Sequence, residues 1–310
     1  MICVRKISAC GGNSRSMKRF QVTEYELYSD FFSVNARPVT VVLLADLHNC
    51  IYGKKNRRLL GAIEKVRPDF VLCAGDMLVG KKGRSMKPAV DFMTAVAKKF
   101  PVYYGNGNHE YRMRTEPQKY GSMYQEYEET LTRAGVHFLM NDKAIVPAGN
   151  TYVSIYGYEL EGAYYRKFNE LELTKRQLCA RLGEADRNRF SILIAHNPVY
   201  GDTYAEWGAD LTVSGHLHGG IIRIPGVGGI ISPQARLFPK YDGGMYEIGG
   251  RHLVVSRGLG GHTVNIRIFN RPELVVIKLC PPFQGSKEER SRRKRHTVRR
   301  LLHRRSMPRE

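Results

Sequence analysis

Five short apolar runs mark the first 220 residues, and each one ends in a polar or glycine-containing segment. They are PVTVVLLADLH (38–48), DFVLCAGDM (69–77), PVYYGNGNHE (101–110), FSILIAHNP (190–198) and DLTVSGHLHGG (210–220). The runs are nearly continuous in apolar character, which is typical of strands that are buried on both faces. This pattern limits the chain to folds in which both faces of a sheet are covered.

Helical patterns separate these runs, at residues 55–69, 88–100, 118–135 and 172–188. Strands and helices that alternate at this spacing predict an α/β architecture. Residues 221–280 contain only strand and turn patterns, which indicates a second sheet with antiparallel character. No repeat and no linker precede residue 285, so we expect one domain over residues 20–285.

The net charge of +20 is concentrated at the two ends of the chain. Residues 286–310 hold 11 Lys and Arg against three Glu, and residues 1–19 hold five Lys and Arg and no acid, which leaves +7 for residues 20–285. We therefore predict a basic N-terminal extension (1–19) and a basic, disordered tail (286–310). Such ends are usually solvated, although they could make weak contact with an anionic membrane or a nucleic acid. The tail lacks the interleaved aromatic residues that stack on bases.

The cysteines are scattered and form no C-x-x-C motif, which favours reduced thiols in a cytosol over a disulfide framework. No apolar stretch approaches the roughly 18–20 residues that cross a bilayer. The segment ISAC near the start resembles a lipoprotein cleavage box, but Arg5 and Lys6 stand where an apolar signal region would run. We expect a cytoplasmic protein without a transmembrane segment, with peripheral membrane contact as the alternative.

Residues that can bind a metal follow each of the five predicted strands. They are Asp46, His48, Asp76, Asn108, His109, His196, His216 and His218. Loops that leave the carboxyl ends of strands in an open α/β sheet form binding sites, so these side chains can converge. One such histidine is more often a core or surface residue, but five in the same context favour a metal site.

The donor types predict two metal ions. Carboxylate, carboxamide and imidazole groups together suit divalent or trivalent Mn, Fe or Zn, and no thiolate is needed. One carboxylate can bridge two ions about 3.5–4 Å apart. Asp76 is the candidate bridge because it stands alone at its strand end and follows a glycine. Gly75, Gly107 and Gly215 each precede a candidate ligand and let the backbone turn and approach closely.

The order of these motifs resembles that of the calcineurin-like metallophosphoesterases. The motifs are D-x-H (46–48), G-D (75–76), G-N-H-E (107–110), the histidine of AHNP (195–198) and G-H-L-H (215–218). Flanking text such as DLHN and SRGLGG is similar to the bacterial branch of YaeI- and YkuE-type phosphohydrolases, and it extends the resemblance to about residues 20–280. The resemblance implies a four-layer α/β/β/α sandwich with two mixed β-sheets and a dinuclear centre.

The resemblance also implies a role for each matching residue. One metal would be bound by Asp46, His48, Asp76 and His218, and the other by Asp76, Asn108, His196 and His216. His109 would be no ligand but the general acid or charge stabiliser. The implied enzyme is a dinuclear-metal-dependent phosphohydrolase that cleaves a phosphodiester or phosphomonoester by in-line attack of a metal-bridging hydroxide.

The substrate is less constrained than the reaction. The G-D motif continues as GDMLVG and not as GDxxDRG, which disfavours a Ser/Thr protein phosphatase. The alternatives are a pyrophosphate hydrolase of the UDP-2,3-diacylglucosamine type, a nucleic-acid phosphodiesterase and a non-enzymatic, metal-stabilised scaffold. The expected partner is a small or lipid-linked phosphoester. Residues in later loops that could reach its phosphate are Arg223, Arg236, Lys240 and His262.

Overall fold

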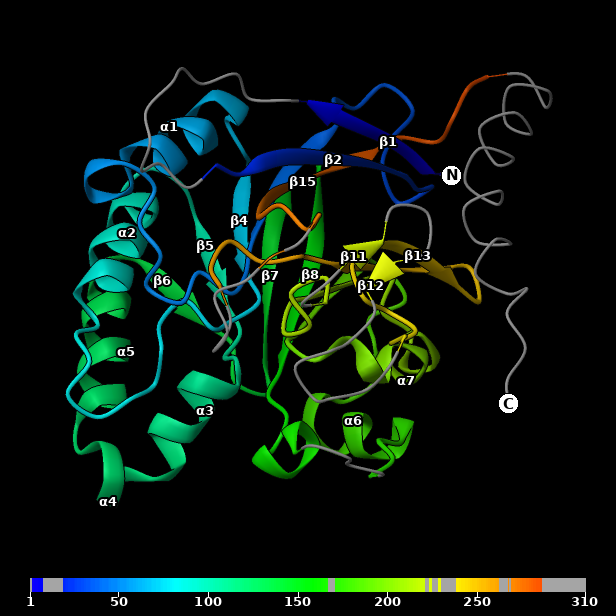
Figure 1. The fold of residues 1–310 in the computed structure, drawn as a ribbon. Coiled ribbons are helices and arrows are strands. Elements are labelled where there is room, and N and C mark those ends of the chain that lie inside the picture. The colour runs from blue at the N-terminus through cyan, green and yellow to red at the C-terminus, as the bar shows by residue number, and fades with distance from the viewer. Residues whose placement is uncertain are drawn as a thin grey trace.

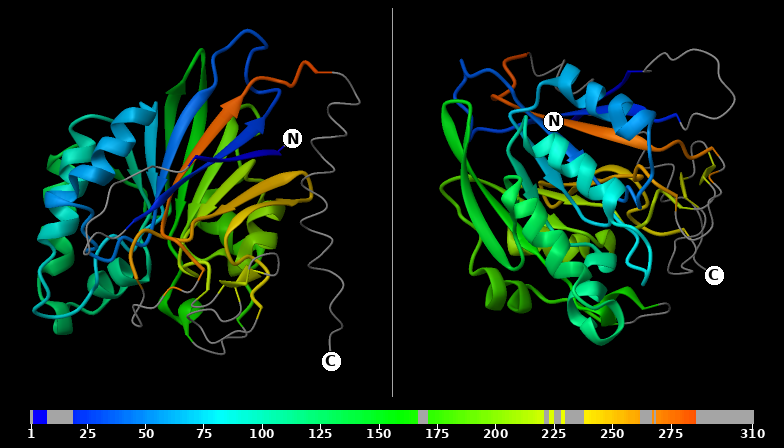
Figure 2. Two further views of the ribbon diagram at one scale, coloured as in Figure 1. Left: turned by 45° about the horizontal axis from the view of Figure 1, so that its top comes forward. Right: turned by 90° about the vertical axis from the view of Figure 1, so that its left-hand side faces the viewer.

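Two mixed β-sheets lie face to face, and helices cover the outer face of each sheet (Figures 1 and 2). The computed structural model describes residues 2–7, 19–166, 171–220, 223–224, 228–229, 238–261, 267 and 269–285. The predicted tail (286–310) lies outside these residues. Residues 2–7 of the predicted N-terminal extension form a strand, and the proposed domain boundaries at residues 20 and 285 stay predictions.

The first sheet has seven strands in the described part of the chain. Their order is β1 (Ile2–Ile7), β2 (Gln21–Tyr28), β15 (Glu273–Cys280), β3 (Val39–Leu44), β4 (Phe70–Cys73), β5 (Val102–Tyr104) and β6 (Val136–Phe138). Strands β3 to β6 are parallel, whereas β15 runs antiparallel to β3 and β1 antiparallel to β2. The parallel half of the sheet carries the first three ligand motifs.

The second sheet contains the remaining two motifs. Its order is β13 (Gly244–Ile248), β14 (Arg251–Val255), β10 (Leu211–Ser214), β9 (Phe190–Ala195), β8 (Thr151–Tyr158) and β7 (Asp142–Ala148). The inner strands β14, β10, β9 and β8 are parallel, and the two edge strands are antiparallel. A separate two-stranded sheet pairs β11 (Arg223–Ile224) with β12 (Gly228–Gly229).

The antiparallel character expected for residues 221–280 holds only in part. Strand β13 is antiparallel, but β14 joins the second sheet as a parallel neighbour of β10. Strand β15 leaves that sheet altogether and inserts between β2 and β3 of the first. Seven of the eight residues of β15 are buried, which fits a central position rather than an edge.

Helices form the two outer layers. Helices α1 (Arg57–Val66), α2 (Lys87–Ala97) and α5 (Met123–Arg133) cover the first sheet, and α6 (Lys175–Leu182) and α7 (Gly201–Trp207) cover the second (Figure 1). The four predicted helical segments are confirmed, although residues 118–135 divide at Gly121 (φ 62°) into α4 (Pro117–Tyr120) and α5. Helices α3 (Asn108–Thr115) and α7 were not predicted. No helix in the described ranges is both long and apolar enough to span a bilayer.

Successive side chains of a strand point to opposite faces of its sheet and so belong to different hydrophobic cores. In β3, Val42 and Leu44 pack against the helices of the first layer, whereas Val41 and Leu43 face the second sheet. In β9, Ile192 joins that core between the sheets, and its neighbours on the opposite face pack against α6 and α7. The predicted four-layer α/β/β/α sandwich with two mixed sheets is therefore confirmed.

Candidate metal centre

The structure brings the predicted ligand residues of both sheets together at the carboxyl ends of their parallel strands. Asp46 and His48 follow β3, Asp76 follows β4, and Asn108 opens α3 just after β5. From the second sheet, His196 follows β9, and His216 and His218 follow β10. All of these side chains except Asn108 belong to groups of three whose donor atoms lie within 4.8 Å of one another.

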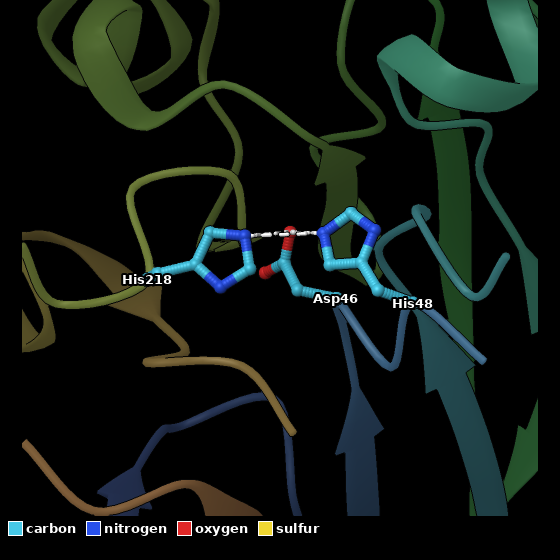
Figure 3. A group of neighbouring side chains, drawn as sticks. All are labelled: Asp46, His48 and His218. Atoms are coloured by element: carbon cyan, nitrogen blue, oxygen red, sulfur yellow. Dashed lines mark hydrogen bonds and ion pairs between the residues drawn. The ribbon is translucent and has the colours of Figure 1, made fainter. Parts of the chain in front are cut away.

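One group consists of Asp46, His48 and His218 (Figure 3). The Nε2 atoms of the two histidines are 3.1 Å apart. Oδ1 of Asp46 lies 3.5 Å from Nε2 of His218 and 3.9 Å from Nε2 of His48. Two imidazoles and one carboxylate, all buried, thus aim their donor atoms at one point.

The second group consists of Asp76, His196 and His216. Oδ2 of Asp76 lies 3.3 Å from Nε2 of His196, and the rings of His196 and His216 are 5.1 Å apart between centroids. The same Oδ2 atom lies 3.9 Å from Nε2 of His48 in the first group. Asp76 therefore stands between the two groups.

These donors fit bound cations. Oδ1 of Asn108 and Nε2 of His196 are buried, and neither has a hydrogen-bond partner within the described residues. Buried polar atoms are nearly always hydrogen-bonded, so buried donor atoms without such a partner are suited to bind a cation. The donors are oxygens and imidazole nitrogens, the set that first-row divalent ions accept.

Backbone strain is concentrated in the ligand loops. Five candidate ligands have a left-handed backbone with φ between 47° and 67°: Asp46, His48, Asp76, His216 and His218. This conformation is uncommon for residues other than glycine, and it clusters at functional sites where the surrounding structure enforces it. The strained residues come from both sheets.

Two glycines allow the ligand loops to approach one another. A Cβ atom on Gly107 would lie 2.2 Å from Oδ1 of Asp76, and one on Gly215 would lie 2.4 Å from Oδ2 of Asp46. Both distances are far shorter than any van der Waals contact, so a side chain at either position would displace a ligand carboxylate. The sequence predicted that the backbone at these glycines approaches the site closely. In the structure, each glycine lies against the carboxylate of a candidate ligand.

Glu110 holds two of the candidate ligand loops in place, the one after β4 and the one after β5. Its buried carboxylate accepts hydrogen bonds from the backbone N–H groups of Asp76 (2.9 Å), Met77 (3.0 Å) and Gly107 (3.1 Å) and from the hydroxyl of Tyr104 (2.8 Å). Burial, together with the nearby Asp76, raises the pKa of Glu110 to about 7, whereas the hydrogen bonds from the Tyr104 hydroxyl and the Asp76 backbone act in the opposite direction. The sequence contained this residue as the last letter of G-N-H-E, but its role was not recognised.

Hydrogen bonds on the far side of the rings orient the imidazoles. Nδ1 of His196 donates to the carbonyl of Ala74 (2.5 Å), which leaves Nε2 free of a proton and directed at Asp76 when the ring is neutral. The backbone N–H of His216 donates to both carboxylate oxygens of Asp46, at 3.1 and 3.0 Å. These contacts join the second sheet to the loops of the first.

His109 lies beside the two groups and is held differently. Nδ1 of its ring accepts a hydrogen bond from the N–H of Gly80 (2.9 Å), and Nη2 of Arg112 lies 3.0 Å from the same atom. Both partners can only donate, so the proton of a neutral His109 resides on Nε2. Its ring is 5.0 Å from that of His48 between centroids.

Charges within the site shift the pKa values of its members. Burial and the neighbouring Asp76 raise the pKa of Asp46 to about 7, against the opposing effect of His196. Burial alone would lower the pKa of His196, but Asp76 and Asp46 outweigh it and raise the value to about 9. For Asp76, burial is opposed by the nearby imidazoles, which hold the pKa of its carboxyl well below the usual range. Positive charge is thus most strongly favoured beside Asp76.

Of the four residues in later loops that were expected to reach a phosphate, the two that the structure describes form ion pairs with carboxylates. The Arg223 guanidinium pairs with Asp242 (3.0 Å), and the Lys240 ammonium pairs with Asp202 (2.6 Å). Arg236 and His262 lie outside the described residues. Arg112, which has no distinctive signal in the sequence, contacts His109 (3.0 Å) and donates to the backbone carbonyl of the candidate ligand Asn108 (3.2 Å).

Comparison with known proteins places this geometry in a family. The model of the calcineurin-like phosphoesterase family matches residues 39–220, which include every candidate ligand. The chain belongs to the calcineurin-like phosphoesterase family. It is accordingly a metal-dependent phosphoesterase, a hydrolase that acts on phosphoester bonds.

The similar curated proteins belong to the branch that the sequence motifs indicated. Phosphodiesterase YaeI of Escherichia coli is 28% identical over 253 residues, which cover 80% of this chain and 85% of YaeI. The uncharacterized metallophosphoesterase YkuE of Bacillus subtilis is 25% identical, over 84% of this chain and 85% of YkuE. Among solved structures, the phosphopantetheinyl hydrolase PptH of Mycobacterium tuberculosis aligns with a TM-score of 0.43 and 16% identity, over 70% of this chain and 88% of PptH.

Proposed function

We propose that this calcineurin-like phosphoesterase is a phosphohydrolase that uses two metal ions. The observation that carries the proposal is the position of Asp76. Its Oδ2 atom lies 3.9 Å from Nε2 of His48 and 3.3 Å from Nε2 of His196, so one carboxylate serves both groups of donors. A shared carboxylate is the usual bridge of a two-metal hydrolase.

Each ion has its own set of ligands in this proposal. Asp46, His48 and His218 would hold one ion together with Asp76, and Asp76 would hold the other with Asn108, His196 and His216. The Asn108 carboxamide supports the second set because its buried Oδ1 has no hydrogen bond within the described residues. The oxygen and imidazole donors suit Mn, Fe or Zn.

The two ions, when bound, would neutralise charge on the phosphoryl oxygens and make a water molecule nucleophilic at neutral pH. The protein side chains orient the substrate and move protons. His109 directs its protonated Nε2 away from Gly80, so this N–H can donate a hydrogen bond that stabilises the charge developing on the departing oxygen. Arg112 and Gly80 hold that tautomer in place.

A phosphodiester is the substrate class that the comparisons favour. YaeI, which is similar over most of its length, carries the name phosphodiesterase. The segment GDMLVG departs from the motif of Ser/Thr protein phosphatases, which is a further reason to place protein substrates last.

The direct test is hydrolysis of bis(p-nitrophenyl) phosphate and p-nitrophenyl phosphate by the full chain purified with Mn²⁺. We expect the diester to be cleaved faster and elemental analysis to give two ions per chain. Asp76→Asn should abolish both properties. Asp91→Asn, which changes a solvent-accessible carboxylate on α2, is the matched control. Equal activity in Asp76→Asn and the unchanged protein would show contamination and refute the proposal.

The role of His109 is tested separately. His109→Ala should keep a near-normal metal content, because His109 is no ligand in this proposal. Turnover should fall by about 10²- to 10³-fold, the usual loss when one hydrogen-bond donor to a developing oxyanion is removed. Loss of metal from this variant would instead make His109 a ligand, which its position near His48 and Asp76 would then explain.

A further inference from the structure

Two loops beside the candidate metal centre carry a concentration of positive charge. Residues 49–58 and 77–87 contain eight basic residues and no Asp or Glu, whereas the whole of 20–285 has a net charge of only +7. We call these residues the basic rim: Lys54, Lys55, Arg57, Arg58, Lys81, Lys82, Arg84 and Lys87. The excess positive charge of the domain is therefore confined to two short segments.

The two loops are joined to each other and to the catalytic residues. Residue Asn49 bridges them, because its backbone N–H donates to the carbonyl of Met77 (3.0 Å) and its side chain donates to the carbonyl of Ser85 (3.2 Å). One loop begins directly after the ligand His48 and the other directly after Asp76. The second loop also contains Gly80, whose N–H holds His109. The basic rim is thus continuous with the site.

Most of these charges form no ion pair within the described part of the chain. Lys54, Lys55, Arg57, Lys81, Lys82 and Arg84 are exposed, and none forms an ion pair with another described residue. Lys87 is different, because it pairs with Asp91 (3.0 Å).

The basic rim lies at the N-terminal ends of two helices, where positive charge destabilises a helix. Helices α1 and α2 both begin in it, and neither has an acidic residue in its first turn. The N-terminal end of a helix carries partial positive charge and is stabilised by acids, so cations there repel it. An arrangement that disfavours folding and raises the positive potential is the pattern expected for a surface that meets an anionic partner.

The side chains around the basic rim favour a lipid surface over a nucleic acid. Tyr52, the aromatic residue of these two loops, is only 1% exposed and cannot stack on a base. The exposed apolar residue is Ile51, at 49%. Clustered Lys and Arg next to an exposed aliphatic side chain match the combination by which peripheral proteins bind anionic bilayers.

We propose that the basic rim docks the protein on an anionic lipid surface, with the candidate metal centre facing that surface. The proposal deepens the proposed function, because a docked enzyme would meet its phosphoester at the membrane. Binding itself is measured without turnover and can fail or succeed independently of it.

The test is co-sedimentation of the full chain with vesicles. Vesicles of 30% phosphatidylglycerol in phosphatidylcholine are compared with pure phosphatidylcholine, in low salt and in 0.5 M NaCl. Lys81→Gln/Lys82→Gln should lower partitioning onto the anionic vesicles by about tenfold or more, since each basic residue near such a surface contributes several-fold. The double variant Lys54→Gln/Lys55→Gln should do the same through the other loop.

The matched control is Lys65→Gln/Lys98→Gln. These two exposed lysines lie at the opposite ends of the same helices, at the end of α1 and just after α2. The control removes the same charge and should leave partitioning within twofold. The two basic ends of the chain are present in every variant, so differences between variants report only on the basic rim.

Three results would overturn the proposal: equal partitioning of rim variants and control, partitioning of the unchanged protein that is the same on neutral and anionic vesicles, or selective loss of single-stranded DNA binding with vesicle binding intact. The last result would assign the basic rim to nucleic acid. Thermal melting of each variant identifies a folding defect, and the two rim variants change different loops. Hydrolysis of bis(p-nitrophenyl) phosphate by the unchanged protein tests the proposed function separately.

Discussion

The two sheets contribute to the candidate metal centre in different ways. The loops of the first sheet are held by a residue of their own half, because Glu110 binds the backbone around Asp76 and Gly107. Two candidate ligands of the second sheet are bound by groups of the first, in addition to the hydrogen bond from the Gly215 N–H to the His196 carbonyl (3.0 Å) within their own half. The ring of His196 is oriented by the carbonyl of Ala74, and the backbone of His216 is bonded to Asp46.

This difference implies an order of dependence. The loops of the first sheet have internal support, so they can keep their shape when a ligand of the second sheet is altered. The histidines of the second sheet lose their orientation whenever the loops after β3 and β4 move. A substitution that moves the loops of the first sheet should therefore disturb the whole site. A substitution in the loops of the second sheet should disturb mainly the histidines of those loops.

The largest effect is expected from Glu110→Gln, which disturbs the support of the first half. The amide nitrogen of glutamine would face backbone N–H groups that now donate to a carboxylate, so at least one buried donor loses its partner. We expect activity to fall about 100-fold or more and the free energy of unfolding to fall by about 3 kcal/mol. Diester hydrolysis and urea denaturation measure these two consequences, and metal analysis shows whether the variant still binds its ions.

Tyr104→Phe is the control for this variant. It removes one donor to Glu110 and leaves the three backbone donors intact, so the free energy of unfolding should fall by about 1 kcal/mol. If Tyr104→Phe and Glu110→Gln were equally damaging, the ligand loops would not depend on the backbone contacts, and the proposed asymmetry would be wrong.

The strands and the donor set could be predicted from the sequence because both leave a direct signal. Apolar runs mark buried strands, and Asp, Asn and His at their ends mark metal chemistry. Helix α3 could not be predicted in this way, since NHEYRMRT has no apolar stripe and buries Glu110 beside Met113. Glu110 and Arg112 were missed as functional residues for a related reason. Their partners are backbone amides and a ring nitrogen, which the fold alone brings within reach.

The path of the last strand shows a second limit of sequence reasoning. The run ELVVIKLC predicts a strand but does not specify a sheet, and β15 takes the central place between β2 and β3. That choice depends on contacts with residues some 240 positions earlier, which periodicity does not record. Local patterns therefore predicted the elements, whereas long-range packing decided their neighbours.

A smaller effect is expected from Gly215→Ala, which acts from the second half of the site. The new Cβ would lie 2.4 Å from Oδ2 of Asp46 and 2.9 Å from Cβ of Ala45, so the loop after β10 must move away from β3. We expect metal affinity to fall roughly 30-fold, within the range for disturbed support of metal ligands. Titration with Mn²⁺ measures this change.

The matched glycine is Gly61 in α1, where an added Cβ would have no atom within 4 Å. Gly61→Ala should leave metal affinity unchanged and stabilise the protein by about 0.5–1 kcal/mol through helix propensity. If Gly215→Ala also left metal affinity unchanged, the two sheets would not be in the close contact on which the comparison depends.

Arg112 provides a finer test, because it supports His109 entirely from the first half. Nη2 of Arg112 lies 3.0 Å from Nδ1 of His109, and its Nε donates to the carbonyl of Asn108 (3.2 Å). Arg112→Met should lower turnover about tenfold with unchanged metal content, the loss expected for one charge-assisted hydrogen bond. Lys at this position should restore part of the rate. A rise in KM with unchanged turnover would show that Arg112 binds the substrate and does not position His109.

The smallest effect concerns the second sheet alone and should appear in stability rather than activity. Burial lowers the pKa of His252 in β14 to about 4, below the value near 6.5 of an exposed histidine. Between pH 6.5 and 4, His252 binds a proton in the unfolded chain but not in the folded one. The contribution of the neutral His252 to the free energy of unfolding is therefore complete above pH 6.5 and is lost as the pH falls toward 4. His252→Gln has no such proton, so its urea midpoint should fall less than that of the unchanged protein over this range. The difference should reach about 1 kcal/mol between pH 6.5 and 5.5.

Identical pH dependence in both proteins would show that His252 does not titrate differently on folding. A loss of diester hydrolysis at pH 7.5 would show that the second sheet supports the site more directly than its contacts indicate.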